Sequence, residues 1–234
     1  MKRIALDGRL LSAAKFVRQG AVFADVGTDH AHLPVFLLKS GRICRAVLSD
    51  INEGPLASAR ENVEREGLSS LVTLILTDGA VSLEGMGITD VAVCGMGGEL
   101  ISKIVSDAEW LKDSSVRLIL QPMTRQAHLR RTLASLGFKI FGESYSHSSG
   151  KYYVTIAAEY TAEPYELTPE IAEFGEEFVD YDNKASQIRY LELKLAALTK
   201  KIRGMREAGM STETCEELEG ALRRRITLIL GAEQ

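Results

Sequence analysis

Short, continuously apolar runs alternate with helical patterns through the first 160 residues of this 234-residue chain. Strands that read as unbroken apolar runs are buried on both faces, and amphipathic stretches between them are typical of helices that cover a parallel sheet. We expect strands at 21–25, 44–50, 71–76, 90–94 and 116–121, and helices at 31–39, 54–66, 97–108 and 124–136. The pattern therefore predicts an α/β fold built on a mostly parallel sheet.

Two more strands are expected at 138–146 and 151–160, with the turn SHSSGK between them. Neighbouring strands that are joined by so short a turn are antiparallel. The predicted sheet thus has seven strands, of which the first five are parallel and the last two form a hairpin.

Residues 163–234 follow a different pattern, in which apolar residues recur at spacings of three or four. Such spacing is typical of the seam between two packed helices. The apolar positions are Ile188, Leu191, Leu195, Leu198, Ile202 and Met205, then, after a break at Gly209, Cys215, Leu218, Leu222, Ile226 and Ile229. We therefore expect an antiparallel helical hairpin, and divide the chain into a sheet domain (1–162) and a hairpin domain (163–234).

The first helix of this hairpin is basic, although the whole chain has a net charge of −4. Residues 184–206 contain seven Lys and Arg residues and one acidic residue, Glu192. Two interpretations stay open: a solvated face on a hairpin that merely packs or dimerises, or a surface that contacts nucleic-acid phosphates. For the second, the candidates are Lys200, Lys201 and Arg203. An apolar seam of this kind can pack within one chain or between two chains. We expect a monomer and leave a dimer open.

Cysteine usage and hydropathy limit the setting of the protein. Cys44, Cys94 and Cys215 are far apart and form no C-x-x-C pattern, which favours a reducing cytoplasm and argues against a zinc site or any other metal centre. No apolar run reaches the roughly 18 residues of a membrane span, and the N-terminus lacks the features of a signal peptide. We therefore expect a cytoplasmic protein without a membrane or metal partner.

The loop FADVGTDHAHLP, residues 23–34, follows the first predicted strand, where α/β folds bind their ligands. It is not a P-loop, and it lacks the second and third glycines of a dinucleotide fingerprint. Asp29 would place a carboxylate against a pyrophosphate, which disfavours NAD and FAD. A nucleoside with a cationic group remains, and S-adenosylmethionine (SAM) fits, with Asp25, Gly27 and Thr28 completing its site beside Asp29.

Acidic residues also end the next two predicted strands. Asp50, followed by Ile51, is placed to accept the hydroxyls of an adenosine ribose, although NAD enzymes share this feature. Asp78, in the segment TDGA, can accept a hydrogen bond from the exocyclic amine of adenine, and the backbone amide of Gly79 or Ala80 can donate to a ring nitrogen. Asp is common in turns, so each position alone is weak, but the set favours a SAM site.

The fourth and fifth predicted strands supply candidate contacts to a methyl acceptor. AVCGMGGEL places Cys94 and Gly95 beside the cofactor, and its glycines can admit a flat ring, although a tight turn without a ligand is the other interpretation. Gln121, in LQPMTRQAHLRRTL, can contact a base edge, and a basic patch follows it. The candidate acceptor-binding residues in these two segments are Met96, Gly97, Gly98, Arg125 and Arg130.

With these motifs the sequence resembles the bacterial TrmK family of SAM-dependent methyltransferases, which modify N1 of adenine 22 in tRNA. The resemblance rests on DVGTDHAHLP, SDINEGPLASARENV, TDGA, GMGGELI and LQP, and it extends over essentially the whole chain. It implies a Rossmann-like class I methyltransferase fold, SAM as cofactor, tRNA as partner, and a coiled-coil-like C-terminal domain that helps to hold tRNA. Ala80 departs from the usual DGL.

Methylation of adenine N1 needs no general base, because N1 of neutral adenine carries a lone pair in the plane of the ring. The methylated ring is cationic, so Asp29 is expected to stabilise the developing charge. His30 and His32 are candidates to orient the base or to shuttle the N6 proton, although a loop histidine is more often an ordinary hydrogen-bonding residue. Gln121 or the backbone at Gly95 would contact the base edge after the nucleotide is turned out of its stack. Two alternatives remain: a SAM methyltransferase for another RNA, a small molecule or a protein, and a non-catalytic SAM- and RNA-binding module.

Overall fold

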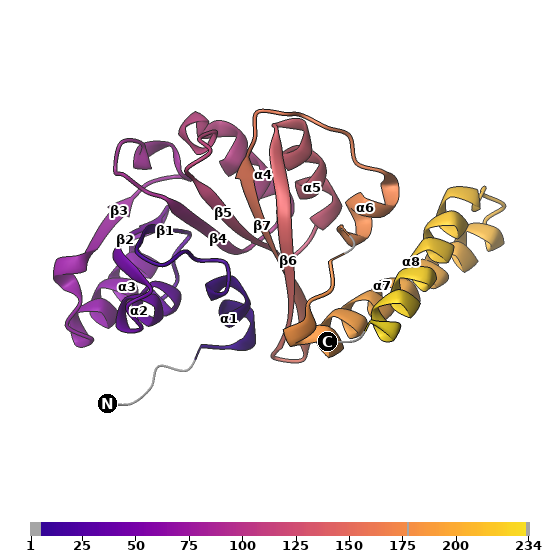
Figure 1. The fold of residues 1–234 in the computed structure, drawn as a ribbon, viewed down its shortest axis with the longest axis horizontal. Helices are drawn as coiled ribbons and strands as arrows, with labels where there is room; N and C mark the ends of the chain where they lie inside the picture. Colours follow the sequence, from indigo (N-terminus) through magenta and orange to yellow (C-terminus); the bar gives the residue numbers. More distant parts are fainter. Residues whose placement is uncertain (1–5, 177, 233–234) are drawn as a thin grey trace.

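The computed structural model describes residues 6–176 and 178–232, and its centre is one seven-stranded sheet (Figure 1). The strand order is β3-β2-β1-β4-β5-β7-β6, with β1 to β5 parallel and β7 antiparallel to both β5 and β6. The strands are β1 Ala21–Val26, β2 Ile43–Asp50, β3 Val72–Leu76, β4 Asp90–Met96, β5 Arg117–Pro122, β6 Phe138–Ser148 and β7 Lys151–Tyr160. The predicted sheet and its terminal hairpin are confirmed.

The hairpin turn is shorter than expected. β6 continues to Ser148, so only Ser149 and Gly150 connect it to β7. Both residues have positive φ, 49° and 76°, which is the backbone of a two-residue type I′ turn. The strands pair from Phe138 with Tyr160 to Ser148 with Lys151, with one shift of register between Ile140 and Gly142.

Helices cover both faces of the sheet. Four of them, α2 to α5, lie close to their expected positions, and two short helices, α1 and α6, were not predicted from the sequence. Asp7 caps α1 by accepting from the amide of Leu10, and Thr168 caps α6 by accepting from the amide of Ile171. The helices are α1 Gly8–Ala14, α2 His32–Lys39, α3 Glu53–Arg65, α4 Gly98–Asp107, α5 Gln126–Ser135, α6 Pro169–Phe174, α7 Lys184–Glu207 and α8 Glu213–Gly231.

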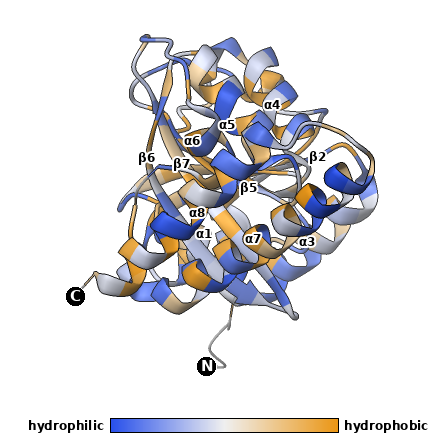
Figure 2. Ribbon diagram, turned by 90° about the vertical axis from the view of Figure 1, so that its right-hand side faces the viewer, coloured by the Kyte–Doolittle hydropathy of each residue, from blue (hydrophilic) through white to orange (hydrophobic). Residues whose placement is uncertain are grey.

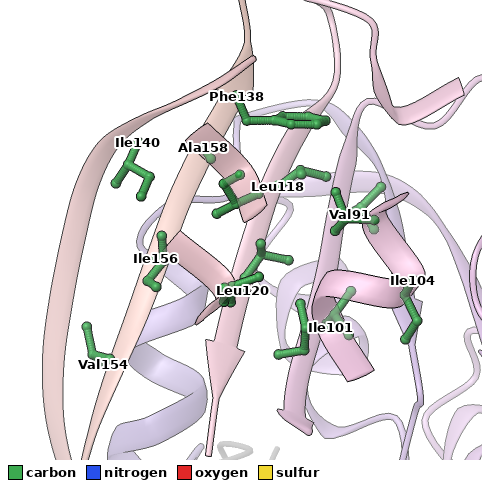
Figure 3. Packing of buried hydrophobic residues seen from close by; sticks show 14 of the residues in the cluster. Val91, Ile101, Ile104, Leu118, Leu120, Phe138, Ile140, Val154, Ile156 and Ala158 are labelled. Atoms are coloured by element: carbon green, nitrogen blue, oxygen red, sulfur yellow. The ribbon is translucent and has the colours of Figure 1, made fainter. Parts of the chain in front are cut away.

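The two faces of the sheet carry separate cores. Residues of α1, α2 and α3 pack on one face around Phe23, Leu48 and Ile119. Residues of α4 and α5 pack on the other, where Ile101 and the strand residues around it are almost fully buried (Figure 3). Burial of apolar side chains on both faces explains why these strands read as continuous apolar runs.

The C-terminal hairpin forms as predicted, and its base belongs to the second of these cores. α7 and α8 pack along the expected seam, and both helices carry apolar and polar residues around their circumference (Figure 2). Leu191 and Leu222 are fully buried in the same cluster as sheet residues such as Ile156. The hairpin is thus anchored at its base while its far end extends away from the sheet (Figure 1). The predicted division at residue 162 stays a prediction.

A buried ionic network lies at this junction and overturns one expectation. Arg130 of α5 is fully buried and not on the surface, so the predicted contact between Arg130 and nucleic acid is wrong. Its Nε donates to Glu143 Oε1 at 2.7 Å and its Nη1 donates to the carbonyl of Ala172 at 3.0 Å. The Tyr145 hydroxyl donates to Glu143 Oε2 at 2.8 Å, and burial raises the pKa of Tyr145 well above its ordinary value.

Within the described ranges, no helix is both long and apolar enough to cross a membrane. The same ranges contain no group of three or more His, Cys, Asp or Glu side chains placed to hold a metal ion.

Candidate cofactor and acceptor site

The loops that follow β1 and β4 meet at the carboxyl edge of the sheet and enclose a small pocket together with the start of α1. Its lining includes Arg9, Asp25, Gly27, Asp29, His32 and Cys94. The sequence analysis placed four of these in the candidate site. Two of the lining residues, Asp25 and Asp29, are carboxylates, which suit a ligand that carries a positive charge.

Asp25 is the buried acid of this pocket. Only 8% of the residue is exposed, and it accepts from the Thr28 hydroxyl at 2.8 Å. Burial raises the pKa of Asp25 to about 6, against the lowering effects of the Thr28 hydrogen bond and the Arg9 charge. A cation in the pocket would favour the ionised carboxylate. Thr28 is itself fully buried, so in this structure its side chain holds Asp25.

The loop after β1 is held in one shape by its backbone. The amides of Gly27 and Thr28 both donate to the carbonyl of Ser49, at 2.8 and 2.9 Å, which fixes the loop to β2. Gly27 has a φ of 77°, and a Cβ at that position would collide with the end of the Met96 side chain. The positive φ therefore favours glycine at residue 27, and a larger residue would also displace the end of the Met96 side chain.

Asp29 and His30 form the outer rim of the site. The Asp29 side chain is 78% exposed, and His30 Nε2 lies 3.3 Å from Asp29 Oδ1. His30 and Ala31 both have positive φ, 58° and 54°, and the His30 carbonyl accepts from Asn62 Nδ2 at 2.6 Å. This strained turn presents Asp29 and His30 to solvent at the mouth of the pocket, where a methyl acceptor would approach.

The predicted adenosine contacts lie on the neighbouring strands β2 and β3. Asp50 Oδ1 accepts from the amide of Asn52 at 2.7 Å, and Ile51 beside it is 61% exposed. The amide of Thr77 donates to the Asp50 carbonyl at 3.0 Å, which holds the turn containing Asp78 and Gly79 next to β2. An exposed apolar side chain flanked by strand-end acids suits a flat base attached to a ribose.

The turn after β4 is packed against the turn after β5. The Gly98 amide donates to the Thr124 carbonyl at 2.8 Å, and a Cβ on Gly98 would lie 2.5 Å from the carbonyl oxygen of Arg125. Gly98 is buried by protein backbone, so the expectation that it admits a flat ring is wrong. Gly95 has a φ of 81° and is exposed, and Gly97 caps α4, so these two glycines remain beside the open site.

The remaining candidates around this turn lie at different depths. Burial raises the pKa of the Cys94 thiol to about 12, so the thiol stays protonated and is a poor nucleophile. Met96 is half-buried, and its carbonyl accepts from the Met123 amide. Arg125, at the start of α5 with a φ of 55°, is exposed and lies 3.3 Å from Glu99. Arg125 thus keeps the surface position that was expected of it.

Gln121 differs from its expected role. The residue is 0% exposed, and its Nε2 donates to the Arg9 carbonyl at 3.0 Å and to Thr155 Oγ1 at 3.2 Å. Its Oε1 accepts from Arg9 Nη1 at 3.1 Å. The side-chain amide is therefore engaged with protein groups and does not face a base edge, because β7 and α1 cover it.

Arg9 is the permanently charged residue of the pocket that the sequence analysis missed. α1 lies beside β6 and β7 and carries Arg9 into the pocket, although α1 is only seven residues long. A helix of this length has too few residues for a periodic apolar pattern. The available signal was Asp7, a good N-cap residue placed directly before GRLLSAA.

These residues fit SAM, a cationic nucleoside that supplies an activated methyl group on a sulfonium. The buried acid Asp25 gains from a cation, Gly27 leaves space in the loop, and acids at the ends of β2 and β3 suit an adenosine. Asp25, Asp50 and Asp78 would hold the cofactor, with Ile51 and Gly79 beside its base.

The comparisons with known proteins agree with this site. Residues 6–156 match a family described as a methyltransferase domain. The chain is 32% identical over 159 residues to the tRNA (adenine(22)-N(1))-methyltransferase of Bacillus subtilis strain 168, covering 68% of this chain and 67% of that protein. The fold and the site together define a Rossmann-like methyltransferase that uses SAM.

Similar solved structures show which family of methyltransferases this chain belongs to. A Streptococcus pneumoniae protein in complex with S-adenosyl-L-methionine shares 30% identity at a TM-score of 0.81, covering 95% of this chain and all of that one. The B. subtilis M1A22 tRNA methyltransferase TrmK shares 26% identity at a TM-score of 0.78, covering 97% of this chain and 98% of that one. This chain belongs to the TrmK family of methyltransferases.

The raised pKa of Asp25 predicts how cofactor affinity depends on pH. A cationic ligand binds the ionised carboxylate, whose fraction grows as pH rises through about 6. The affinity for S-adenosylhomocysteine (SAH), which keeps the ammonium group, should therefore fall by up to roughly tenfold per unit below pH 6 and level off above it. Calorimetric titration between about pH 5 and about pH 8 measures this dependence.

The matched control is Asp25→Asn, which retains an acceptor for the Thr28 hydroxyl but does not titrate. Its SAH affinity should be lower at neutral pH and nearly independent of pH across the same range. A wild-type affinity that is flat through pH 6 would show that Asp25 does not respond to the ligand charge.

Proposed function

We propose that this chain transfers a methyl group from SAM to N1 of adenine 22 in tRNA, in the cytoplasm. The observation that carries the proposal is the likeness to TrmK structures over nearly the whole chain, hairpin included, together with the B. subtilis relative that is named for this reaction. The exposed carboxylate of Asp29 at the mouth of the pocket supports it, because the product of N1 methylation is a cationic ring.

The groups of this chain then have defined tasks. N1 of neutral adenine attacks with its ring lone pair, so no residue has to remove a proton first. Asp29, at the rim, offsets the positive charge that spreads over the ring during attack. His30, 3.3 Å from Asp29, and the exposed backbone at Gly95 are placed to orient the base.

The decisive experiment is nucleoside mass spectrometry of unmodified tRNA after incubation with the protein and SAM. We expect 1-methyladenosine from tRNA with adenine at position 22, and none from the same tRNA with guanine there. Methylation of both tRNAs would place the target elsewhere. Absence of methylated nucleoside, while the protein binds SAM, would assign it another acceptor or a purely binding function.

We further propose that the hairpin contacts tRNA phosphates. Lys200 and Arg203 of α7 and Arg223 of α8 converge on a groove between the two helices, and both α7 residues are exposed. Lys201, also exposed, lies outside that groove's lining. The cations converge although the chain is acidic overall, which supports a phosphate-binding surface.

Neutralising this surface tests its role. The triple variant Lys200→Gln, Lys201→Gln, Arg203→Gln should bind tRNA more weakly, and the slope of log affinity against log salt should fall by roughly 0.9 for each lost contact to a duplex. SAH affinity should not change. Fluorescence anisotropy over a salt series measures both quantities.

The charge-matched control removes three exposed cations from the sheet domain, Arg42, Arg60 and Lys139, also by replacement with glutamine. This control has the same net charge as the hairpin variant. An equal loss of tRNA affinity in the two proteins would therefore mean that only net charge matters. Normal tRNA binding by the hairpin variant would remove the proposed role of α7.

A further inference from the structure

The turn between β6 and β7 projects beyond the edge of the sheet at which the candidate site lies. β7 pairs with β5 from Glu159 to Ile156, but it pairs with β6 as far as Lys151. The segment 151–155 therefore continues past the carboxyl end of β5 by about 17 Å, at roughly 3.4 Å per residue. We call residues 147–153 the β6–β7 tip, which lies between α1 and the start of α7 (Figure 1).

The β6–β7 tip is joined to the pocket through α1. A Cβ on Gly8 would lie 2.7 Å from the His147 carbonyl oxygen, so α1 and the tip are in close backbone contact. The next residue of α1, Arg9, lines the pocket. On β7, Thr155 Oγ1 accepts from Gln121 Nε2 at 3.2 Å, and Gln121 Oε1 accepts from Arg9 Nη1. A molecule whose reacting part enters the pocket therefore meets the tip beside it.

Two aromatic rings are paired at this tip. His147 and Tyr152 occupy directly opposite positions on the two strands, and their ring centroids lie 4.6 Å apart with the planes inclined by 36°. Tyr152 is half-buried against the core that includes α7, while His147 is exposed. His147 thus presents an aromatic ring to solvent with Tyr152 behind it. Bases of any sequence stack on exposed rings of this kind.

Cations flank the aromatic pair. Lys151, the first residue of β7, is exposed. On α7, the Arg189 side chain is 56% exposed and donates to Glu192 Oε2 at 2.9 Å. Glu192 raises the pKa of Arg189, and Tyr152 adds a smaller effect of the same sign, so the guanidinium lies near both groups. An exposed pair of this kind is weak, so a phosphate can compete with Glu192 for the arginine.

A base that leaves its stack to be methylated uncovers the faces of its neighbours. An aromatic pair with cations beside it is complementary to a nucleotide in that state, because the ring takes the base and the cations take the phosphate. We propose that the β6–β7 tip binds a nucleotide adjacent to the methylated one, with His147 stacked on its base and Lys151 on its phosphate. The inference rests on the proposed function, since it requires an RNA acceptor.

Two RNAs separate base stacking from charge: unmodified tRNA, and a fully paired RNA duplex with the same number of nucleotides. In fluorescence anisotropy, His147→Ala should weaken tRNA binding by at least about fivefold, because one stacked base is lost, and leave duplex binding within about twofold of wild type. His147→Phe keeps an aromatic ring but no ring nitrogen, and it should bind tRNA within about twofold of wild type.

Lys151→Gln tests the phosphate contact. It should weaken tRNA binding and lower the slope of log affinity against log salt by roughly 0.7, the value for one contact to an unpaired strand. The matched control is Lys139→Gln, which removes an exposed cation from the other end of the same two strands, opposite Glu159, and should leave both quantities unchanged. Calorimetry should give every variant the SAH affinity of wild type.

Four results would overturn the proposal: unchanged tRNA binding by His147→Ala, an equal loss in His147→Phe, an equal loss in Lys139→Gln and Lys151→Gln, or a loss of SAH affinity that parallels the loss of tRNA binding. The methylation assay is decided separately. A tip that binds tRNA as expected in a protein that forms no 1-methyladenosine would leave the tip in place and remove the proposed target. Methylation of adenine 22 with normal tRNA binding by every tip variant would remove the tip alone.

Discussion

Asp29→Asn is expected to lower the rate of methyl transfer at saturating substrates by roughly tenfold to a hundredfold while changing the affinity for SAH by less than about threefold. The reason is the cationic ring formed when adenine N1 is methylated. The Asp29 side chain is 78% exposed in the free protein, so its charge is well screened until a base covers the rim. Its effect should therefore be larger on the transition state than on cofactor binding.

Single-turnover measurement of 1-methyladenosine formation, beside calorimetry with SAH, separates these two effects. The control is Asp182→Asn, which removes an equally exposed carboxylate that pairs with Lys15 and does not line the pocket. Unchanged transfer by Asp29→Asn, or an equal loss in the control, would contradict a role for Asp29 in charge stabilisation.

Arg130→Met is expected to destabilise the fold by about 3–5 kcal/mol, because it leaves the buried carboxylate of Glu143 without its charged partner. Both side chains of this pair are 0% exposed, and Arg130 also joins α5 to α6 through the Ala172 carbonyl. Tyr145 would be the remaining donor to Glu143. Urea denaturation at neutral pH measures the loss as a shift of the midpoint.

Two further variants make this result specific. The double variant Arg130→Met, Glu143→Gln removes both charges and should recover a large part of the lost stability. Arg223→Met breaks the more exposed pair with Glu219 on α8 and should cost less than about 1 kcal/mol. A loss in Arg130→Met no larger than in Arg223→Met would show that the buried pair is not a major stabilising contact.

Much of the fold follows from the sequence, because strand burial and helix amphipathicity leave periodic patterns. The strands of the sheet, the terminal hairpin and the apolar seam between α7 and α8 were all predicted close to their observed positions. The acids at the ends of β1, β2 and β3 were also predicted to share one edge, since parallel strands present their carboxyl ends together. Asp25 and Asp29, from β1 and its loop, line one pocket, whereas Asp50 and Asp78 are not among its lining residues, so the shared site stays a prediction.

The wrong site predictions all concern residues that are covered by distant parts of the chain. The sequence around such a residue does not show what covers it. Arg130 lies in the basic run LRR and looks exposed, but α6 and β6, distant in sequence, enclose it. Gln121 ends a strand like a ligand-binding residue, yet α1 covers it. Gly98 packs against the backbone of Thr124 and Arg125 and leaves no room there for the ring of a base. In each case tertiary packing determined the role.

The anchoring of the C-terminal hairpin has a geometric consequence. α7 spans 24 residues, or about 36 Å, and its base shares one core with the sheet while its tip extends away from it. Under the proposed contact between the hairpin and tRNA phosphates, this fixed length sets the distance between the methylated atom and the phosphates that are bound. Adding seven residues to each helix would move the tip by about 10 Å without changing any pocket residue, and under the same proposal it should change which acceptors are methylated.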